Sequence, residues 1–263
     1  MRRFSVREAF LIVGVLAASP VSGAVKVHVM DGRPFVNGVY LNGHGPYRFL
    51  VDTGTTLNHF DPKLMKSAGL KAGFRTQLMS STGFSAAEGA DGIEVRLDSV
   101  RMPGQKFLFA GLDALHERYP EVDGVLGQEF LSRFDYLLDL NRGRLEFGTA
   151  KAPEGKTRAS FRVVAGRPVV STNLGSLVLD SGVNQVTLFH AEEFSLTHRL
   201  ITMTGTVPVG MVSRHLIIDG RTLWRGSAVA VPRPAETEAA GLLPANLFRT
   251  IYVSNSDGYL ALD

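Results

Sequence analysis

Two copies of one short pattern, 128 positions apart, constrain this chain more than any other feature. Each copy is a run of apolar residues that ends in Asp, then Thr or Ser, then Gly; the first lies at residues 49–54 and the second at 177–182. An apolar strand that ends in this way leaves a carboxylate where the strand becomes a loop, beside a hydroxyl group and a flexible glycine. Two such loops could bring two carboxylates together.

The sequence after each Asp loop repeats as well, in the same order and with similar spacing. Each copy is followed by an apolar segment that starts with glycine, a second apolar run, a strand-like run and a hairpin signal. The matching pairs are 124–127 and 241–244, 130–134 and 246–248, 136–139 and 251–253, and 141–143 and 256–258. This pattern indicates an internal duplication.

Length and composition fit two medium-sized lobes. The 263 residues are 44% hydrophobic and include 28 glycines, which is enough apolar material for a substantial core. A polar, turn-rich stretch from about residue 149 lies between the end of one repeat and the start of the next. We therefore expect an N-terminal lobe at residues 25–150, a linker at 151–158 and a C-terminal lobe at 159–263.

Residues 1–24 are typical of a signal peptide. Three arginines precede an apolar run at residues 10–18, and Pro20 and several small residues follow it. The run is too short to span the roughly 30 Å of hydrocarbon in a bilayer. We expect cleavage near Ala24, export to a bacterial periplasm or secretion, and no stable membrane span after cleavage. An uncleaved N-terminal anchor is the alternative.

Charge and cysteine content narrow the possible functions. The formal charge of +3 falls to about +1 without residues 1–24, because that segment carries three arginines and one glutamate. No run of interleaved basic and aromatic residues is present, so the sequence disfavours nucleic-acid binding. The absence of cysteine excludes a thiol nucleophile and thiolate metal sites, and it is compatible with export, since a core of this size needs no disulfides.

Short strands separated by turn residues dominate the mature sequence. Apolar or alternating runs predict strands in both halves. These runs lie at residues 25–30, 35–41, 47–51, 93–97, 107–110, 136–140, 144–147, 161–164, 177–179, 186–189, 216–218 and 227–231. Helices are expected to be few and short. One should run from Asp61, an N-cap followed by Pro62, to Gly69, and another from Gly127 or Gln128 to about Arg133.

The paired loops resemble those of the retropepsin-like and pepsin-like aspartic proteases, and the chain looks like a bacterial member of that group. The resemblance covers nearly all of the mature sequence and is carried by LVDTGT at residues 50–55 with Leu126-Gly127, and by VLDSG at 178–182 with Leu242-Leu243. It implies an all-β, bilobal acid protease fold with two related β-barrel-like lobes, few short helices and an active cleft between the lobes.

The resemblance also implies roles for the loop residues. Asp52 and Asp180 would be the catalytic pair, because two adjacent carboxylates share one proton and can act as general base and general acid on a water molecule. Neither a covalent intermediate, a metal nor another cofactor is required. The residues expected to support the two loops are Thr53, Gly54, Thr55, Ser181 and Gly182.

The second loop departs from the pattern at two positions. Val183 stands where Thr55 would supply a hydroxyl donor, and Pro244 replaces the glycine that matches Gly127. Proline lacks an N–H group and fixes its backbone angle, so the support of the Asp180 loop should differ from that of the Asp52 loop.

Two glycine-containing stretches, at residues 79–85 and 203–210, occupy the positions of the hairpin flaps that cover the cleft in such enzymes. The alternative is two ordinary surface hairpins. The pepsin-type flap tyrosine is missing from both stretches, which favours the retropepsin-like side of the group. The residues expected to contact substrate are Ser81, Thr82, Gly83, Thr204 and Gly205.

Other residues that could carry chemistry fit structural roles better. The seven histidines show no helical metal-ligand spacing with an acidic partner, so no metal site is predicted. They are His28, His44, His59, His116, His190, His198 and His215. Ser195 and Ser213 lie in no nucleophile-elbow context, and Trp224 is expected in the core or the cleft wall.

The sequence thus predicts an exported, monomeric aspartic endopeptidase that acts on a peptide or protein substrate through Asp52 and Asp180. The main alternative is a non-catalytic peptide- or ligand-binding protein that retains this fold, with its chemistry weakened by Val183 and Pro244. A cleft formed by two chains is a third interpretation, but one chain already carries both loops.

Overall fold

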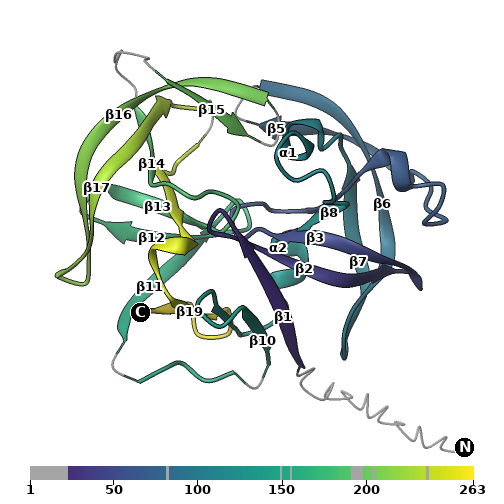
Figure 1. Cartoon of the computed structure of the whole chain (residues 1–263), viewed down its shortest axis with the longest axis horizontal. Helices are drawn as coiled ribbons and strands as arrows, with labels where there is room; N and C mark the ends of the chain where they lie inside the picture. Colours follow the sequence, from purple (N-terminus) through teal and green to yellow (C-terminus); the bar gives the residue numbers. More distant parts are fainter. Residues whose placement is uncertain are drawn as a thin grey trace, which may run out of the picture.

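The computed structural model describes residues 23–80, 83–148, 150–154, 156–190, 198–202, 205–234 and 237–263 (Figure 1). Most of the predicted signal peptide lies outside this part of the chain, as do Ser81, Thr82, Ser195 and Thr204. Within the described residues, no helix is long and apolar enough to cross a membrane.

The first half of the chain is built from ten strands among the described residues, with two helical turns and one 3₁₀ turn between them. The strands are β1 (Gly23–Met30), β2 (Arg33–Leu41), β3 (His44–Val51), β4 (Asn58–Phe60), β5 (Phe74–Ser80), β6 (Gly83–Leu97), β7 (Val100–Phe109), β8 (Gly124–Leu126), β9 (Tyr136–Asp139) and β10 (Arg144–Phe147). The helical segments are η1 (Pro62–Leu64), α1 (Asp113–His116) and α2 (Gln128–Leu131).

The second half repeats the same series with one 3₁₀ turn. Its described strands are β11 (Thr157–Val164), β12 (Arg167–Thr172), β13 (Gly175–Asp180), β14 (Thr187–His190), β15 (His198–Thr202), β16 (Gly205–Ile218), β17 (Arg221–Pro232), β18 (Gly241–Pro244), β19 (Thr250–Ser254) and β20 (Tyr259–Leu262), and its 3₁₀ turn is η2 (Ala245–Leu247).

The strand pairing repeats between the halves. In the first, β3 pairs in parallel with β8, and β4 pairs with β7 in parallel and with β8 antiparallel. In the second, β13 pairs in parallel with β18, and β14 pairs with β17 in parallel and with β18 antiparallel. The all-β, bilobal pepsin- and retropepsin-like fold expected from the sequence is therefore confirmed.

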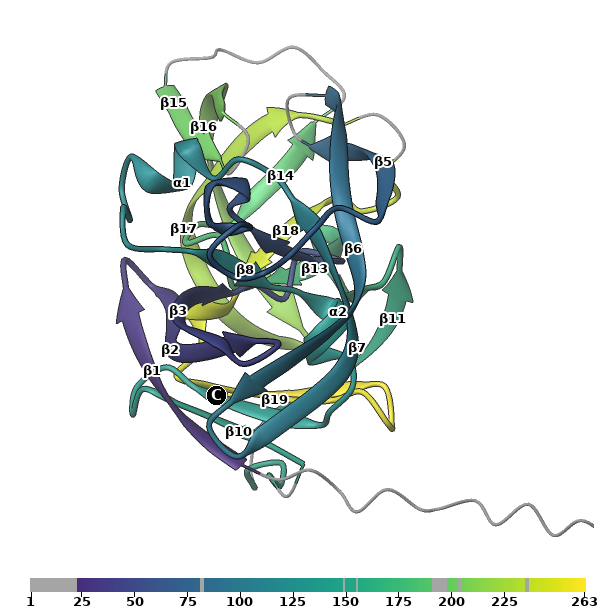
Figure 2. The ribbon, with the colours of Figure 1, turned by 90° about the vertical axis from the view of Figure 1, so that its right-hand side faces the viewer.

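A sheet shared by both halves closes the base of the molecule. Its antiparallel order is β1-β10-β9-β19-β20-β11, so each half contributes three strands. The central contact is β9 with β19, where Leu138 faces Ile251. Figures 1 and 2 show this sheet on the side of the molecule opposite β5 and β15. Because main-chain hydrogen bonds run across it, the sheet fixes the two halves relative to each other.

The packing of the first half differs in kind from that of the second. In the first half, aromatic rings join the strands that carry the Asp52 loop: Phe49 stacks on Phe60 at 6.1 Å and meets Phe107 edge-on at 6.3 Å. In the second half, aliphatic side chains stand at the matching positions, with the buried Leu177 in place of Phe49 and Leu188 in place of Phe60. Both arrangements bury the strand that precedes the aspartate, which gives the loop a rigid base.

Several predicted elements differ from the structure. The helix expected from Asp61 to Gly69 is reduced to η1; Asp61 caps it by accepting a hydrogen bond from the Lys63 N–H at 2.8 Å, and turns follow. A segment this short gains too few hydrogen bonds to offset the cost of helix nucleation. The second helix is shorter than expected at its C-terminal end. Helix α1 was not predicted, nor were strands β4, β5, β8, β12, β15, β18 and β20. The lobe boundaries stay predictions.

Candidate active site

The two Asp-Thr/Ser-Gly loops begin at equivalent points of the two halves. Asp52 follows the last residue of β3, and its N–H donates to the Leu126 carbonyl in β8 at 2.9 Å. Asp180 is the last residue of β13, beside Pro244 of β18. In each half a buried apolar strand therefore delivers the aspartate next to the strand that runs parallel to it.

The two aspartates meet at the junction of the halves. Asp52 is 6% exposed and Asp180 is 7% exposed, and their carboxyl groups lie within hydrogen-bonding reach of each other. Each carboxyl accepts a hydrogen bond from the glycine of its own loop at 2.8 Å, Asp52 from the Gly54 N–H and Asp180 from the Gly182 N–H. The pair is thus buried, close together and oriented by the backbone.

Glycine is required in both loops because of this close approach. A Cβ atom on Gly54 would lie 2.3 Å from the Asp180 carboxyl carbon, and one on Gly182 would lie 2.7 Å from an Asp52 carboxyl oxygen. Both distances are below any real contact between such atoms. Each glycine therefore makes room for the carboxyl group of the opposite loop.

Thr53 and Ser181 cross-link the loops with four buried hydrogen bonds. The Thr53 N–H donates to the Ser181 hydroxyl and the Ser181 N–H donates to the Thr53 hydroxyl, both at 3.0 Å. The hydroxyls in turn donate across the junction, Thr53 to the Leu179 carbonyl at 2.9 Å and Ser181 to the Val51 carbonyl at 2.7 Å. The exchange is reciprocal, as the duplication leads one to expect.

The two carboxyl groups differ in proton affinity. Burial raises the pKa of Asp180 well above its usual range, and the neighbouring charge of Asp52 raises it further. Burial raises the pKa of Asp52 as well, but hydrogen bonds from the Gly54 amide and the Thr55 hydroxyl oppose the change. Since close carboxylates do not both ionise readily, the pair favours one shared proton, held mainly by Asp180.

Comparison with known proteins agrees with this geometry. Residues 38–130 match the family model described as aspartyl protease. This match ends inside α2, so it includes the Asp52 loop and not the Asp180 loop. No curated protein matches the sequence.

Two solved structures are similar to this chain, one of them over nearly its whole length. Basic 7S globulin from soybean is similar at 12% identity and a TM-score of 0.56, over 93% of this chain and 95% of that one. A retropepsin-like aspartic protease from Rickettsia conorii is similar at 19% identity and a TM-score of 0.38, over 49% of this chain and 92% of that one. The soybean protein supports the aspartic protease-like fold across both lobes, and identities this low carry nothing further.

The Asp52 loop is held by two side chains that sequence analysis did not single out. The Gln128 side-chain amide donates to the Thr53 carbonyl at 2.7 Å. The Asn58 side-chain oxygen, Oδ1, accepts a hydrogen bond from the Gly127 N–H at 3.0 Å. Both side chains are almost fully buried. Neither had a sequence signal, because each stands beside another polar residue, Asn58 next to His59 and Gln128 next to Glu129.

The Asp180 loop has no counterpart of the hydrogen bond between Asn58 and Gly127, because both its donor and its acceptor are replaced. By strand register, Val186 stands where Asn58 stands in the first lobe, and Pro244 stands where Gly127 does. Proline has no N–H to donate, and valine has no oxygen to accept one. The substitution at Pro244 therefore leaves no buried donor unpaired.

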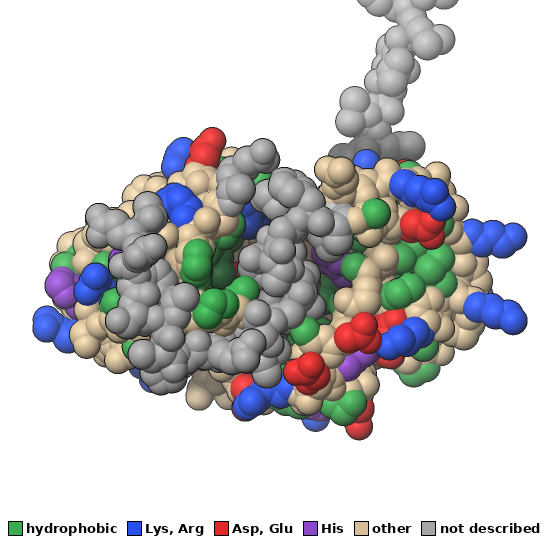
Figure 3. All heavy atoms as spheres, turned by 90° about the horizontal axis from the view of Figure 1, so that it is seen from above, with side chains coloured by type: hydrophobic (Ala, Val, Ile, Leu, Met, Phe, Trp, Pro, Cys, Tyr) green, Lys and Arg blue, Asp and Glu red, His purple; other side chains and the backbone are tan. Residues whose placement is uncertain are grey.

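Each half of the chain also carries a long hairpin on the same side of the molecule. β5 pairs with β6 up to Ser80 and Gly83, and β15 pairs with β16 up to Thr202 and Gly205. The views in Figures 1 and 2 agree in placing both hairpins above β8 and β13. Seen from this side, hydrophobic side chains surround a hollow near the middle of the face (Figure 3). The predicted contact residues Gly83 and Gly205 thus begin the returning strands, and Ser81, Thr82 and Thr204 lie outside the described residues.

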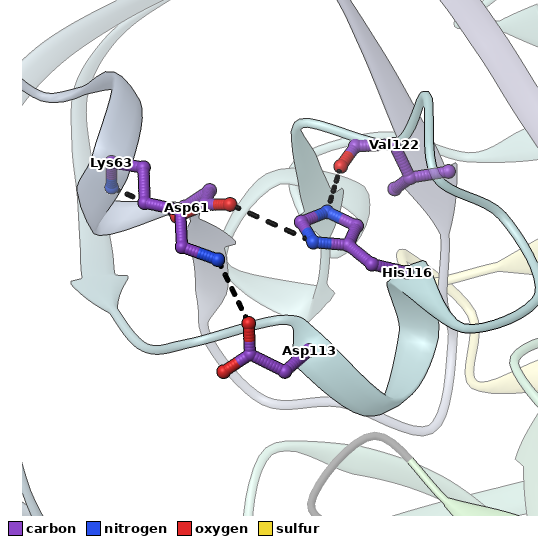
Figure 4. A network of polar contacts seen from close by, with 5 residues as sticks. All are labelled: Asp61, Lys63, Asp113, His116 and Val122. Carbon is purple, nitrogen blue, oxygen red and sulfur yellow. Dashed lines mark hydrogen bonds and ion pairs between the residues drawn. The ribbon is translucent and has the colours of Figure 1, made fainter.

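Histidine and acidic side chains near α1 form a structural network rather than a metal site (Figure 4). His116 donates from Nε2 to the Val122 carbonyl at 2.6 Å, and its Nδ1 lies 3.8 Å from the Asp61 carboxylate. Lys63 forms an ion pair with Asp113 at 2.8 Å. These contacts tie α1 to η1. In the described part of the chain, no group of three or more metal-ligating side chains is placed to hold an ion.

Proposed function

We propose that the protein is an aspartic endopeptidase in which Asp52 and Asp180 hydrolyse a peptide bond with an activated water molecule. The observation that supports this most directly is the buried pair of carboxyl groups, one from each lobe, which lie within hydrogen-bonding reach across the junction. Two interacting carboxyl groups with raised proton affinity are suited to general acid and general base catalysis near the same reacting atom.

The asymmetry of the pair assigns the roles. Asp52, which is better supplied with hydrogen-bond donors, acts as the carboxylate that accepts a proton from water, and the resulting hydroxide attacks the carbonyl carbon. Asp180 starts protonated and donates its proton to the carbonyl oxygen. Return of protons through the pair to the amide nitrogen then allows the C–N bond to break, giving a carboxylic acid and an amine. No covalent intermediate forms on the enzyme.

The substrate is an extended segment of a peptide or protein that lies between the pair and the two hairpins. An extended chain can take hydrogen bonds from hairpin backbone on both sides, which makes recognition depend little on its sequence. We further propose that one chain forms the whole site and acts as a monomer, and that residues 1–24 direct its export to the periplasm or its secretion.

A non-catalytic binding protein with this fold is the second candidate. Val183 favours it, because valine cannot give Asp180 the hydroxyl donor that Thr55 gives Asp52. One observation against it is that Val186 needs no hydrogen bond from Pro244, so the proline leaves no acceptor at position 186 unpaired. Another is that the Asp180 carboxyl keeps two backbone donors, the N–H groups of Gly182 and Val183. Peptide binding without turnover at any pH between about 3 and 7 would favour this candidate.

Asparagine substitutions test the proposal. Asp52→Asn and Asp180→Asn should each lower the rate of casein cleavage roughly a hundred- to ten-thousandfold, the range set by loss of one general acid or base. The matched control is Asp91→Asn, since Asp91 is exposed. Circular dichroism should show all three variants folded. Full peptidase activity in either dyad variant would overturn the proposal.

A further inference from the structure

Arg33 reaches from the first lobe to the aspartate loop of the second. It is the first residue of β2, and its Nε donates to the Gly182 carbonyl at 2.6 Å, across 149 positions of sequence. The same peptide unit carries the Val183 N–H, which donates to the Asp180 carboxyl at 3.2 Å. The Arg33 guanidinium of the first lobe therefore binds the peptide unit whose N–H donates to the Asp180 carboxyl in the second lobe.

The Arg33 side chain is itself held in place. Its Nη1 donates to the Tyr119 hydroxyl at 3.1 Å, and that hydroxyl donates to the Asp31 carboxylate at 2.8 Å. Arg118 completes the chain by pairing with Asp31 at 2.6 Å. Because the Asp31 carboxylate is engaged by Arg118 and Tyr119, the guanidinium of Arg33 is oriented by a hydroxyl group and not neutralised by an ion pair of its own.

The second loop needs a support from outside its own lobe. In the first lobe the buried Gln128 side chain fixes the Thr53 carbonyl, but the residue that matches Gln128 by strand register is Ala245, which has no donor. Within the second lobe, Asn246 donates to the Asn184 carbonyl at 3.1 Å, two residues beyond Gly182. Arg33, from the first lobe, bonds the Gly182 carbonyl, one residue after Ser181, which is the counterpart of Thr53.

The duplication supplies an internal comparison. Arg167 begins β12 as Arg33 begins β2, and each arginine faces the last residue of the preceding strand in its hairpin. Among the described residues, however, the buried Nε of Arg167 has no hydrogen-bond partner. Of these two equivalent arginines in the described residues, Arg33 bonds an aspartate loop and Arg167 Nε does not. The loop that Arg33 bonds is the Asp180 loop, which has no counterpart of Gln128.

We propose that Arg33 is a positioning residue for Asp180, replacing from the opposite lobe the support that Gln128 gives the Asp52 loop. It holds the peptide unit between Gly182 and Val183 so that the Val183 N–H stays on the Asp180 carboxyl, while Tyr119 holds Arg33. The catalytic consequence rests on the proposed endopeptidase function; the structural one does not.

Amide hydrogen exchange tests the structural consequence without any substrate. In Arg33→Ala, exchange at the Gly182 and Val183 amides should become at least about tenfold faster, as expected for loss of a charged hydrogen bond. Exchange at the Gly54 and Thr55 amides should stay within twofold of wild type. Arg167→Ala is the matched control and should leave both loops unchanged. Unchanged exchange at Gly182 and Val183 in Arg33→Ala would overturn the inference.

Two further variants keep the test decisive if Arg33→Ala folds poorly. Tyr119→Phe removes only the hydroxyl that orients Arg33, and it should speed exchange at Gly182 by a few-fold. Arg33→Lys keeps one donor and should give an intermediate value, because lysine lacks the second, fixed N–H of the guanidinium. The inference would be overturned if exchange at Gly182 in Tyr119→Phe equalled that of wild type and exchange in Arg33→Lys were as fast as in Arg33→Ala. Arg33 would then have a merely structural role.

Kinetics on fluorescently labelled casein test the catalytic consequence. Arg33→Ala should lower kcat about tenfold with KM within twofold, Arg33→Lys should recover part of kcat, and Arg167→Ala should match wild type. Wild-type protein that does not cleave casein would argue against the proposed function, while the exchange result would still decide whether Arg33 positions the loop. Cleavage by wild type with unchanged kcat in Arg33→Ala would remove the catalytic part of the inference and leave the proposed function standing.

Discussion

Thr53 and Ser181 each accept the backbone N–H of the other and each donate to a strand of the opposite lobe. Every bond of this set crosses the junction between the lobes, and the two residues are 1% and 0% exposed. Since the cross-link joins the residues that directly follow the two aspartates, any change in the relative position of the lobes would move one carboxyl group against the other. The base sheet and this cross-link therefore fix the junction at two levels.

Removing one hydroxyl of the cross-link should destabilise the protein and impair catalysis together. Ser181→Ala leaves the buried Thr53 N–H and the Val51 carbonyl without partners, a cost of roughly 1–3 kcal/mol for each unpaired group. Chemical denaturation should show the lower free energy of unfolding, and casein cleavage should fall at the same time. The control is Thr53→Ser, which keeps the hydroxyl and should lose much less. Equal stability of Ser181→Ala and wild type would contradict this account.

A methyl group on Gly182 should lower activity on the order of a hundredfold without removing any chemical group from the site. In Gly182→Ala the new Cβ would lie 2.7 Å from an Asp52 carboxyl oxygen, so one of the two loops must shift. Misplacement by about 1 Å costs on the order of a hundredfold in rate. Gly73→Ala is the control, because the nearest atom to a Cβ there is 4.0 Å away. Activity assays alongside melting curves separate the two effects, and an active Gly182→Ala enzyme would show that the loops tolerate movement.

The fold could be predicted from the sequence because the duplication and the two Asp loops are both local patterns. An apolar run that ends in Asp-Thr-Gly is visible in six consecutive residues, and its second copy reveals the pseudo-symmetry directly. The long hairpins β5–β6 and β16–β17 were predicted only in part, at residues 93–97, 216–218 and 227–231, because the rest of their sequences does not alternate regularly.

The supports of the site could not be predicted, because they depend on contacts between residues far apart in the chain. Gln128 and Thr53 are 75 positions apart, and Arg33 and Gly182 are 149 apart. One signal was present: Gly-Arg-Pro occurs at residues 32–34 and again at 166–168, at the start of matching strands. Even this repeat marks the two arginines as equivalent, whereas the structure gives only Arg33 a partner on an aspartate loop.

Restoring the missing hydroxyl at position 183 should shift the pH dependence of activity. In Val183→Thr the new hydroxyl can donate to the Asp180 carboxyl, as the Thr55 hydroxyl does to Asp52, where it lowers the pKa. A lower pKa at Asp180 means that the pair loses its shared proton at lower pH, so the alkaline limb of the activity profile should move toward acid. Profiles of kcat/KM against pH for wild type, Val183→Thr and Val183→Ala make the comparison. A shift in the alanine variant as well would assign the effect to packing.

His59 should limit the stability of the protein in acid, the range in which the proposed reaction operates. Burial lowers the pKa of His59 to about 4, whereas an unfolded histidine titrates near 6.5. The unfolded chain therefore binds a proton that the folded chain excludes between these values, so stability is complete above about pH 6.5 and falls as the pH drops through 4, by roughly 3 kcal/mol in all. In His59→Leu this part of the pH dependence should vanish, so melting temperatures measured from pH 7 to pH 4 should fall less steeply than in wild type. His44→Gln changes an exposed histidine and should keep the wild-type slope. A wild-type slope in His59→Leu would place the acid-sensitive group elsewhere in the chain.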